Sequence, residues 1–386
     1  MDRERLSEIT IRWSYNAAAR TLGALRLKDV VRRHVFPRLV GVLQSSGTHG
    51  SFSVAERYIE EELERLARAD GPIILGPWLS EVGFELLYWI PLLRWFKSTY
   101  NVDPKRLVVV SRGGTRLWYG DLAGTYLDLL DWMAPAEFAL ANQARWKSDL
   151  RQKQFVPLAE DEEIIAWTRA QLPSAKSYVL HPSLMYRLFA PVFQDHVPFT
   201  TLLSHVRYER LPKPVLPGLL ADVLPPEYVA MRFYFRPSFP DCAENRSFVG
   251  DLISRIAKVM PVVLLNTGLE LDDHIDCTDD SVVSLKPYLT PATNLDVQTR
   301  VIANSRGFIG TYGGLCYLAP FFGTNSIGFY SNKAGLNPVH LRAMHSASES
   351  LEGRLMVLHT GDLEFLDLLG LGADKIASRK QSSSIA

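Results

Sequence analysis

A glycine-rich turn between an apolar run and a short helical segment carries the residues best suited to chemistry. The apolar run 307–310 is typical of a buried strand, and Thr311 follows it as a candidate N-cap. Gly313 and Gly314 then let a ligand approach the backbone closely. The first N–H groups of the following helix are unpaired and favour an anion such as a diphosphate. Thr311, Tyr312, Gly313 and Gly314 are therefore candidate donor-binding residues, although a tight turn without any ligand has the same pattern.

Two arginines stand at the end of another apolar run, residues 228–234. In a doubly wound sheet, ligands bind beyond the carboxyl ends of the strands. The guanidinium groups of Arg232 and Arg236 would suit diphosphate oxygens and the charge that grows on a leaving nucleotide. Surface ion pairing is the competing explanation. The next apolar run is followed by three weaker candidates for contact with a nucleoside: Asn266, Thr267 and Gly268.

Carboxylates mark the start of a helix expected over residues 81–100, after the buried strand 72–77. Either Glu81 or Glu85 could deprotonate an acceptor hydroxyl as a general base. Acidic residues also stabilise a helix start without any catalytic role. His181, at the end of the apolar run 178–180, is a reserve base, although a lone histidine is more often structural.

Further candidates lie at the ends of other expected strands. Ser111 and Arg112 follow a buried run and could hold acceptor or phosphate groups, or form a solvated turn. The nine histidines have no metal-binding spacing, and no Asp-x-Asp pair follows an obvious strand. We therefore expect no metal residues and no metal-dependent donor site. Three residues after the last expected strand could help to close the donor site: Asn337, His340 and Arg342.

Continuous apolar strands alternate with helical patterns, which predicts an α/β fold with parallel sheets covered on both faces. A proline-rich stretch over about 205–227 divides the pattern into two similar units, so we expect two facing Rossmann-like lobes. The expected divisions are 1–70, a helical basic arm and linker; 71–215, the acceptor-side lobe; and 216–386, the nucleotide-sugar-binding lobe and tail. Further helices are expected over 53–69, 122–133, 160–171, 245–259, 294–305 and 316–322, and further strands over 106–111, 262–265, 282–285 and 326–330.

The stretch from Ile302 to Tyr330 resembles the donor-site unit of GT-B glycosyltransferases, above all the heptosyltransferase and fucosyltransferase-like branches. The order of its parts is similar to theirs: a helix, a strand, a small-residue turn, a helix with a Leu-Ala pair, a glycine and a strand. The usual acidic residue of that turn is replaced by Tyr312 and Gly313. The segment from Gly76 to Arg94 is similar to the first strand, loop and helix of the same enzymes. The resemblance implies that Glu85, or Glu81 one turn earlier, serves the acceptor hydroxyl.

Composition narrows the functional classes. The chain has 386 residues, 47% of them hydrophobic, with 42 basic and 42 acidic residues, so its formal net charge is zero. A dedicated nucleic-acid-binding protein would show a basic excess. Three scattered cysteines predict a reducing compartment. Residues 1–45 are expected to form a basic helical arm, either packed on the body or lying on an anionic membrane surface. We thus expect a cytoplasmic protein, with peripheral attachment to the inner face of a membrane as one option.

The best hypothesis from the sequence is a glycosyltransferase that moves a sugar from a nucleotide-sugar to a glycan or lipid-linked glycan. The nucleotide-sugar would be a co-substrate, with no cofactor and no metal. A transferase of the polysaccharide pyruvyl type is one alternative, because basic strand ends would suit its anionic donor equally well. A catalytically inactive scaffold subunit of glycan assembly is another.

Overall fold

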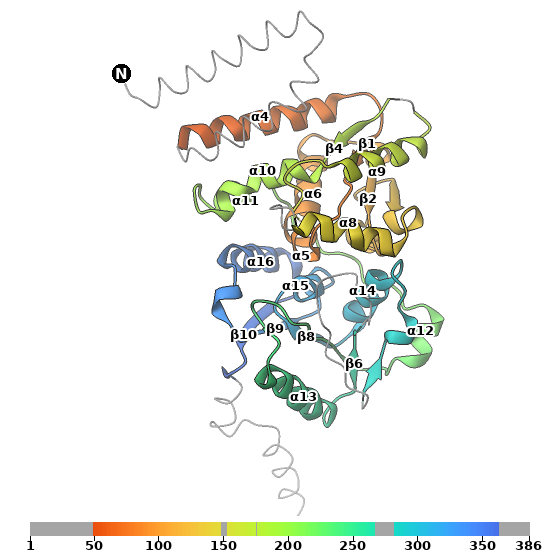
Figure 1. The fold of residues 1–386 in the computed structure, drawn as a ribbon, viewed down its shortest axis with the longest axis vertical. Coiled ribbons are helices and arrows are strands. Elements are labelled where there is room, and N and C mark those ends of the chain that lie inside the picture. Colours follow the sequence, from red (N-terminus) through yellow and green to blue (C-terminus); the bar gives the residue numbers. More distant parts are fainter. Residues whose placement is uncertain (1–48, 148–152, 175, 267–281, 363–386) are drawn as a thin grey trace, which may run out of the picture.

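The computed structural model describes residues 49–147, 153–174, 176–266 and 282–362. They form two α/β lobes, one above the other in Figure 1, each built on a wholly parallel sheet. The first sheet has the order β3-β2-β1-β4 and the second β10-β9-β8-β5-β6-β7. The strands of the first are β1 Ile73–Leu75, β2 Leu107–Ser111, β3 Thr125–Asp128 and β4 Tyr178–Leu180; those of the second are β5 Val229–Arg232, β6 Val262–Leu264, β7 Val283–Ser284, β8 Gly307–Thr311, β9 Ser326–Tyr330 and β10 Leu355–His359.

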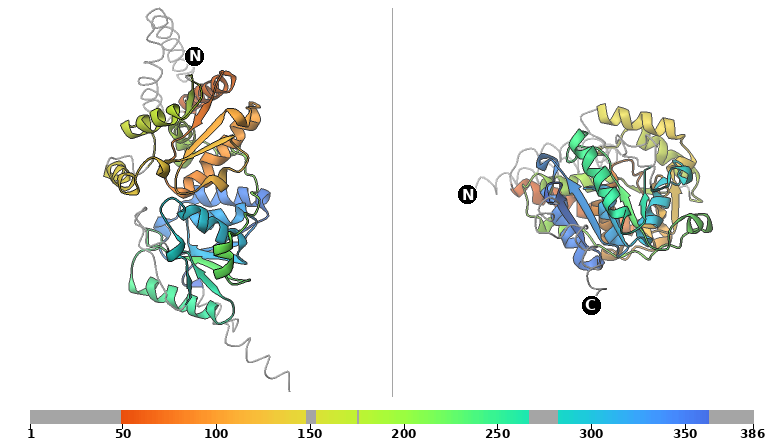
Figure 2. Two further views of the ribbon diagram at one scale, coloured as in Figure 1. Left: turned by 90° about the vertical axis from the view of Figure 1, so that its right-hand side faces the viewer. Right: turned by 90° about the horizontal axis from the view of Figure 1, so that it is seen from below.

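Helices cover both faces of each sheet, as Figure 2 shows from two further directions. The first lobe contains α4 His49–Arg68, α5 Val82–Phe84, α6 Ile90–Thr99, α7 Arg116–Tyr119, α8 Pro135–Lys147, α9 Ala159–Ala170, α10 Pro182–Phe193 and α11 Thr200–Leu203. The second contains α12 Gly218–Val223, α13 Ala243–Ala257, α14 Asn294–Asn304, α15 Gly314–Phe321 and α16 Pro338–Leu351. The expected fold class of two facing parallel-sheet lobes is thus confirmed.

Alternate strand residues pack into different cores, which explains the continuous apolar runs. Ile73 and Leu75 of β1 belong to the core that α4, α6 and α10 complete, whereas Ile74 packs with α8 and α9. In the second sheet, Ala230 of β5 packs toward α14 and α15, and Met231 toward α13. Because successive side chains of a strand point to opposite faces, a sheet covered on both faces needs apolar residues at every position.

One expected element is wrong. The segment 122–133 is not a helix: it contains strand β3 and a short 3-10 turn, Leu129–Asp131. The carboxylate of Asp128 accepts hydrogen bonds from Gly113 N and Gly114 N at 3.1 and 2.8 Å, at the end of the neighbouring strand β2. These non-local bonds and the pairing with β2 override the local helical pattern.

The second sheet also extends further than expected. Helix α16 and strand β10 follow β9, which was expected to be the last strand. Helices α8 and α10 are also present in the structure although the sequence did not predict them. The expected helix over 81–100 is present but begins as α5, widens into a π-helical turn over Glu85–Trp89, and continues as α6. Single π-helical turns occur frequently at functional sites.

Helix α4 belongs to the first lobe. Its residues Ile59, Leu63 and Leu66 are buried in the core with α10. It begins at His49, four residues before the start of the helix expected over 53–69. The basic arm expected over residues 1–45 lies outside the described residues. None of the helices in the described ranges has the length and apolar content needed to cross a membrane.

Several contacts join the two lobes within the described residues. Gly83 of α5 lies against Gly314 of α15, and a Cβ added at Gly83 would lie 3.7 Å from the Gly314 Cα. Leu295 N of α14 donates a hydrogen bond to Gly113 O at 2.8 Å. The connecting segment bonds to both lobes, through Arg207 N to Pro91 O and Leu211 N to Phe321 O. The lobes therefore form one continuous body around the space between them.

We expect the substitution Trp118→Phe to destabilise the folded protein at the boundary between the lobes. The Trp118 Nε1–H donates to Thr299 Oγ1 at 2.8 Å across the lobe boundary, and both side chains are fully buried. Loss of the donor and of part of the ring should lower the free energy of unfolding by about 1–3 kcal/mol. Denaturant titration measures the change. Trp132→Phe, at an exposed tryptophan, is the control, and equal effects of the two substitutions would contradict the prediction.

Candidate functional site

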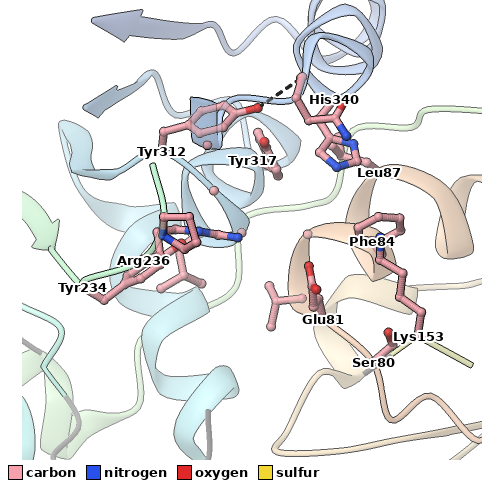
Figure 3. A pocket seen from close by; sticks show the side chains of 18 of the residues that line it. Ser80, Glu81, Phe84, Leu87, Lys153, Tyr234, Arg236, Tyr312, Tyr317 and His340 are labelled. Atoms are coloured by element: carbon pink, nitrogen blue, oxygen red, sulfur yellow. Dashed lines mark hydrogen bonds between the residues drawn. The ribbon is translucent and has the colours of Figure 1, made fainter. Parts of the chain in front are cut away.

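A cavity of about 500 Å³ lies between the lobes, where the carboxyl ends of both sheets meet. Figure 3 shows side chains from both lobes pointing into it. From the first lobe come residues of the loop before α5 and of α5 itself, together with Lys153. The second lobe contributes the segment after β5, the turn before α15, and the start of α16.

The wall of the second lobe is built around the buried ring of Tyr234. Two guanidinium groups flank this ring, with the Cζ of Arg232 at 6.0 Å and that of Arg236 at 5.9 Å from its centroid. Arg232 also donates to Gln298 Oε1 at 2.5 Å. Burial alone would lower the pKa of Arg236, but the nearby Tyr234 and Glu81 outweigh this effect. The pKa is therefore raised, and Arg236 stays charged. The two predicted arginines therefore line the cavity together.

Gly313 brings the turn before α15 against this wall. Its φ is +148°, which side chains rarely adopt, and an added Cβ would lie 2.5 Å from Tyr234 Oη and 2.7 Å from Arg236 Nη1. Only glycine fits there. Gly313 is also the N-cap of α15, so the unpaired N–H groups of this helix start beside Arg236. The helix start and the arginines form one electropositive surface.

Thr311 has a different role from the expected one. It ends strand β8 and does not cap α15. Its hydroxyl accepts from Tyr234 N at 3.0 Å and donates to Tyr234 O at 2.8 Å, so it joins the β8 end to the segment after β5. Thr311 thus positions Tyr234, whereas Tyr312 lines the cavity itself.

The facing wall of the first lobe carries Glu81, the residue before α5. In Figure 3 its carboxylate points into the cavity between Arg236 and Lys153. The preceding carbonyl, Ser80 O, accepts a 2.6 Å hydrogen bond from Arg112 Nη2, which holds the loop in place. Of the two carboxylates that sequence reasoning left open, Glu81 is the one that reaches the cavity.

Glu85 is fully buried and lies behind the cavity wall. Its Oε1 accepts hydrogen bonds of 2.6 Å from both Ser111 Oγ and Tyr119 Oη, and its Oε2 lies 3.5 Å from Arg112 Nη1. Burial raises the pKa of Glu85, and Arg112 opposes this shift. Glu85 and Ser111 are therefore arranged to position Arg112, which does line the cavity.

A buried polar cluster sets the position of Lys153, whose ammonium lies 4.7 Å from the Phe84 ring centroid. The adjacent Gln154 accepts from Leu79 N and donates to Pro77 O, both at 2.8 Å, and donates to Asp161 Oδ1 at 3.0 Å. This amide joins the Lys153 segment to the loop that carries Glu81.

His181, the reserve base, belongs to the same buried cluster. It caps α10 by accepting from Ser183 N through Nδ1 at 3.1 Å, and its Nε2 lies 3.5 Å from Asp161 Oδ1. Burial would raise the pKa of Asp161, but His181 and Arg145 lower it to about 2. His181 does not line the cavity.

His340 of α16 crosses to the first lobe and lies among aromatic rings. Its ring centroid is 5.0 Å from that of Phe84, and its Nδ1 lies 2.5 Å from Tyr88 Oη. Burial, with the positive charges of Lys153 and Arg236, lowers the pKa of His340 to about 3. Because burial also raises the pKa of Tyr88, the phenol donates to Nδ1, and the ring proton is then on Nε2.

The remaining predicted residues are divided between the cavity and its surroundings. Asn337 lines the cavity, whereas Arg342 packs on the Phe199 ring at 4.4 Å and does not. Asn266 is buried and does not line the cavity, and neither of its amide atoms has a hydrogen-bond partner among the described residues. Thr267 and Gly268 lie outside the described residues.

Sequence reasoning missed Lys153, Tyr234 and Tyr317, which also line the cavity. No sequence signal marks Lys153, since its segment forms neither helix nor strand. Tyr234 could have been found, because it follows Arg232 by two residues in the same strand-end segment.

No family model matches the chain, and no curated protein matches it either. Several solved structures match the chain. One is E. coli heptosyltransferase WaaC with ADP, at 12% identity and a TM-score of 0.38, covering 75% of this chain and 93% of that chain. The same enzyme with ADP-2-deoxy-2-fluoro heptose has 12% identity and a TM-score of 0.36, covering 74% and 92%. The glycotransferase of kitacinnamycin has 12% identity and a TM-score of 0.28, covering 81% and 92%.

These structures are of glycosyltransferases, the class that the sequence resembles.

We expect the stability of the protein to fall as the pH is lowered from 7 to 5, in part through His340. A histidine whose pKa is near 3 when folded and near 6.5 when unfolded binds fewer protons in the folded state, so acid favours unfolding. With allowance for water at the cavity wall, this contribution is about 1 kcal/mol. The raised pKa of Glu85 acts in the opposite direction.

Denaturant titration of wild type and His340→Gln at both pH values measures this contribution. The variant should lose less stability than the wild type on acidification. An identical loss in both proteins would contradict the assignment.

Proposed function

We propose that this protein is a glycosyltransferase that takes a sugar from a nucleotide-sugar donor. The observation that carries the proposal is the charge arrangement of the interlobe cavity. Two arginines and a glycine-led helix start line the second lobe, and Glu81 points in from the first. A donor with two phosphates and an acceptor with a hydroxyl need these two kinds of surface on facing sides of one site.

The donor would bind on the second lobe. Its diphosphate would lie against Arg236, Arg232 and the first N–H groups of α15, where backbone donors and fixed positive charges favour an anion. These groups also offset the negative charge that develops on the leaving nucleoside diphosphate. The site supplies this stabilisation through its own side chains, so we propose transfer without a metal ion.

The acceptor, a glycan or lipid-linked glycan, would bind on the first lobe. Glu81 would accept the proton of the attacking hydroxyl, which makes the oxygen a better nucleophile at the sugar carbon. Arg112 and the Gln154 cluster hold the loop and thereby the carboxylate. Rigid support of this kind matters because small displacements of a reacting group reduce the rate steeply.

A nucleotide screen tests the donor assignment. We expect one of UDP, GDP, ADP or CMP to raise the melting temperature without divalent metal, since a ligand of the native state stabilises it by mass action. Arg236→Met should weaken binding of that nucleotide by about 10–100-fold, because a charge-assisted hydrogen bond is lost. A shift with phosphoenolpyruvate alone would favour pyruvyl transfer, and a screen without any shift would contradict the donor site.

Glu81→Gln tests the catalytic assignment. The variant should bind the nucleotide as the wild type does but lose about 10²–10⁴-fold in kcat, the usual contribution of a general base. Transfer from the radiolabelled donor measures the rate, and Glu163→Gln at an exposed position is the control. Full activity of Glu81→Gln would exclude this residue as the base, and nucleotide binding without turnover in the wild type would favour a scaffold subunit.

A further inference from the structure

A second cluster of ionisable side chains lies away from the cavity, between α4 and the end of α11. It consists of Glu56 and Glu60, one turn apart on α4, and of His205, which follows α11. His205 is 3% exposed and packs against the Trp95 ring, with centroids 4.8 Å apart. The glutamate side chains are 36% and 45% exposed. The cluster therefore has a buried imidazole on one side and water on the other.

The hydrogen bonds of His205 determine which ring nitrogen faces the glutamates. Nδ1 lies 2.9 Å from the carbonyl oxygen of Thr201, which can only accept, so Nδ1 carries a proton. In the neutral ring Nε2 then has a bare lone pair, yet it lies 3.0 Å from Glu60 Oε1. Two acceptors at this distance repel each other unless a cation lies between them.

Either a second ring proton or a metal ion would remove this repulsion. A proton on Nε2 serves Glu60 alone, because Glu56 Oε1 approaches the ring only at Nδ1, at 3.9 Å, which is too long for a hydrogen bond. The like charges of Glu56 and Glu60 at positions i and i+4 would remain. A divalent cation would be bound by both carboxylates and by Nε2 at once, after the Glu56 carboxylate turns from the Nδ1 side of the ring toward Nε2.

We propose that His205, Glu60 and Glu56 form a zinc site. One ligand atom from each residue lies within 4.8 Å of the others, and tetrahedral zinc with N and O ligands needs a spacing of about 3.4 Å, which small side-chain rotations supply. The Nδ1 bond to the Thr201 carbonyl is the outer contact that metal-binding histidines generally make. A mixed imidazole and carboxylate set favours zinc over calcium or magnesium. Water would complete the coordination on the exposed side.

Such a site would join α4 to the segment that leads from α11 toward the second lobe. It is independent of the proposed glycosyl transfer, and none of its residues lines the interlobe cavity. Its expected effect is on stability, since an ion that binds the folded chain raises the melting temperature by mass action.

Isothermal titration of the full-length, tag-free chain with Zn²⁺ at neutral pH tests the proposal. We expect one ion to bind through this cluster, with a rise in melting temperature. His205→Gln and Glu60→Gln should each weaken binding by about tenfold or more, since each loses one of three protein ligands. Glu60 is partly exposed, so its variant keeps the test valid should the His205 variant fail to fold.

Two matched controls separate this site from general affinity for zinc. His345→Gln removes an exposed histidine of α16, and Glu61→Gln removes an exposed glutamate of α4. Both should bind Zn²⁺ and respond in melting temperature as the wild type does. Equal zinc binding by wild type and Glu60→Gln, or no binding by the wild type, would overturn the proposal and leave an imidazolium ion pair.

Discussion

The close approach of two helix starts across the lobe boundary is the constraint on which the rest of the site depends. Gly83 and Gly314 let α5 and α15 pack backbone against backbone, and an added Cβ at Gly314 would lie 3.0 Å from the Val82 side chain. Gly313 then has to take a positive φ against Tyr234 and Arg236. Side chains at these positions would push the lobes apart, and the cavity walls would no longer face each other at their present spacing.

This approach brings opposite charges to facing walls without bringing them into a direct ion pair. Glu81 comes from the loop before α5, and Arg236 from the segment after β5, so each lies at the end of an element fixed by its own lobe's core. The cavity between them is where fixed charges exert most influence on a ligand, because the surrounding protein excludes part of the water. Binding and chemistry in the proposed reaction both depend on this separation.

Two buried polar clusters support the wall that the first lobe contributes. Glu85, Ser111 and Tyr119 hold Arg112, and Gln154 with Asp161 holds the loop of Glu81. Buried polar groups are costly unless their bonds are complete, and complete clusters hold one arrangement. Glu85 and His181 are polar residues near strand and helix ends, so the sequence alone suggests them as catalytic candidates. In the folded structure their side chains are buried in these clusters and do not line the cavity.

The sequence by itself determined the two parallel-sheet lobes, because continuous apolar strands alternating with helices fit only a sheet covered on both faces. It also singled out Arg232, Arg236, Gly313 and Gly314, since a strand end followed by arginines or glycines is a local pattern, and these four residues line the cavity. It failed over 122–133, where bonds from Asp128 to the next strand end outweigh local helical preference. Only the tertiary structure separated Glu81 from Glu85 and brought Lys153 to the cavity. The spacing of four residues between Glu81 and Glu85 does not reveal which of the two carboxylates is buried. Burial is decided by segments that lie far away in the chain.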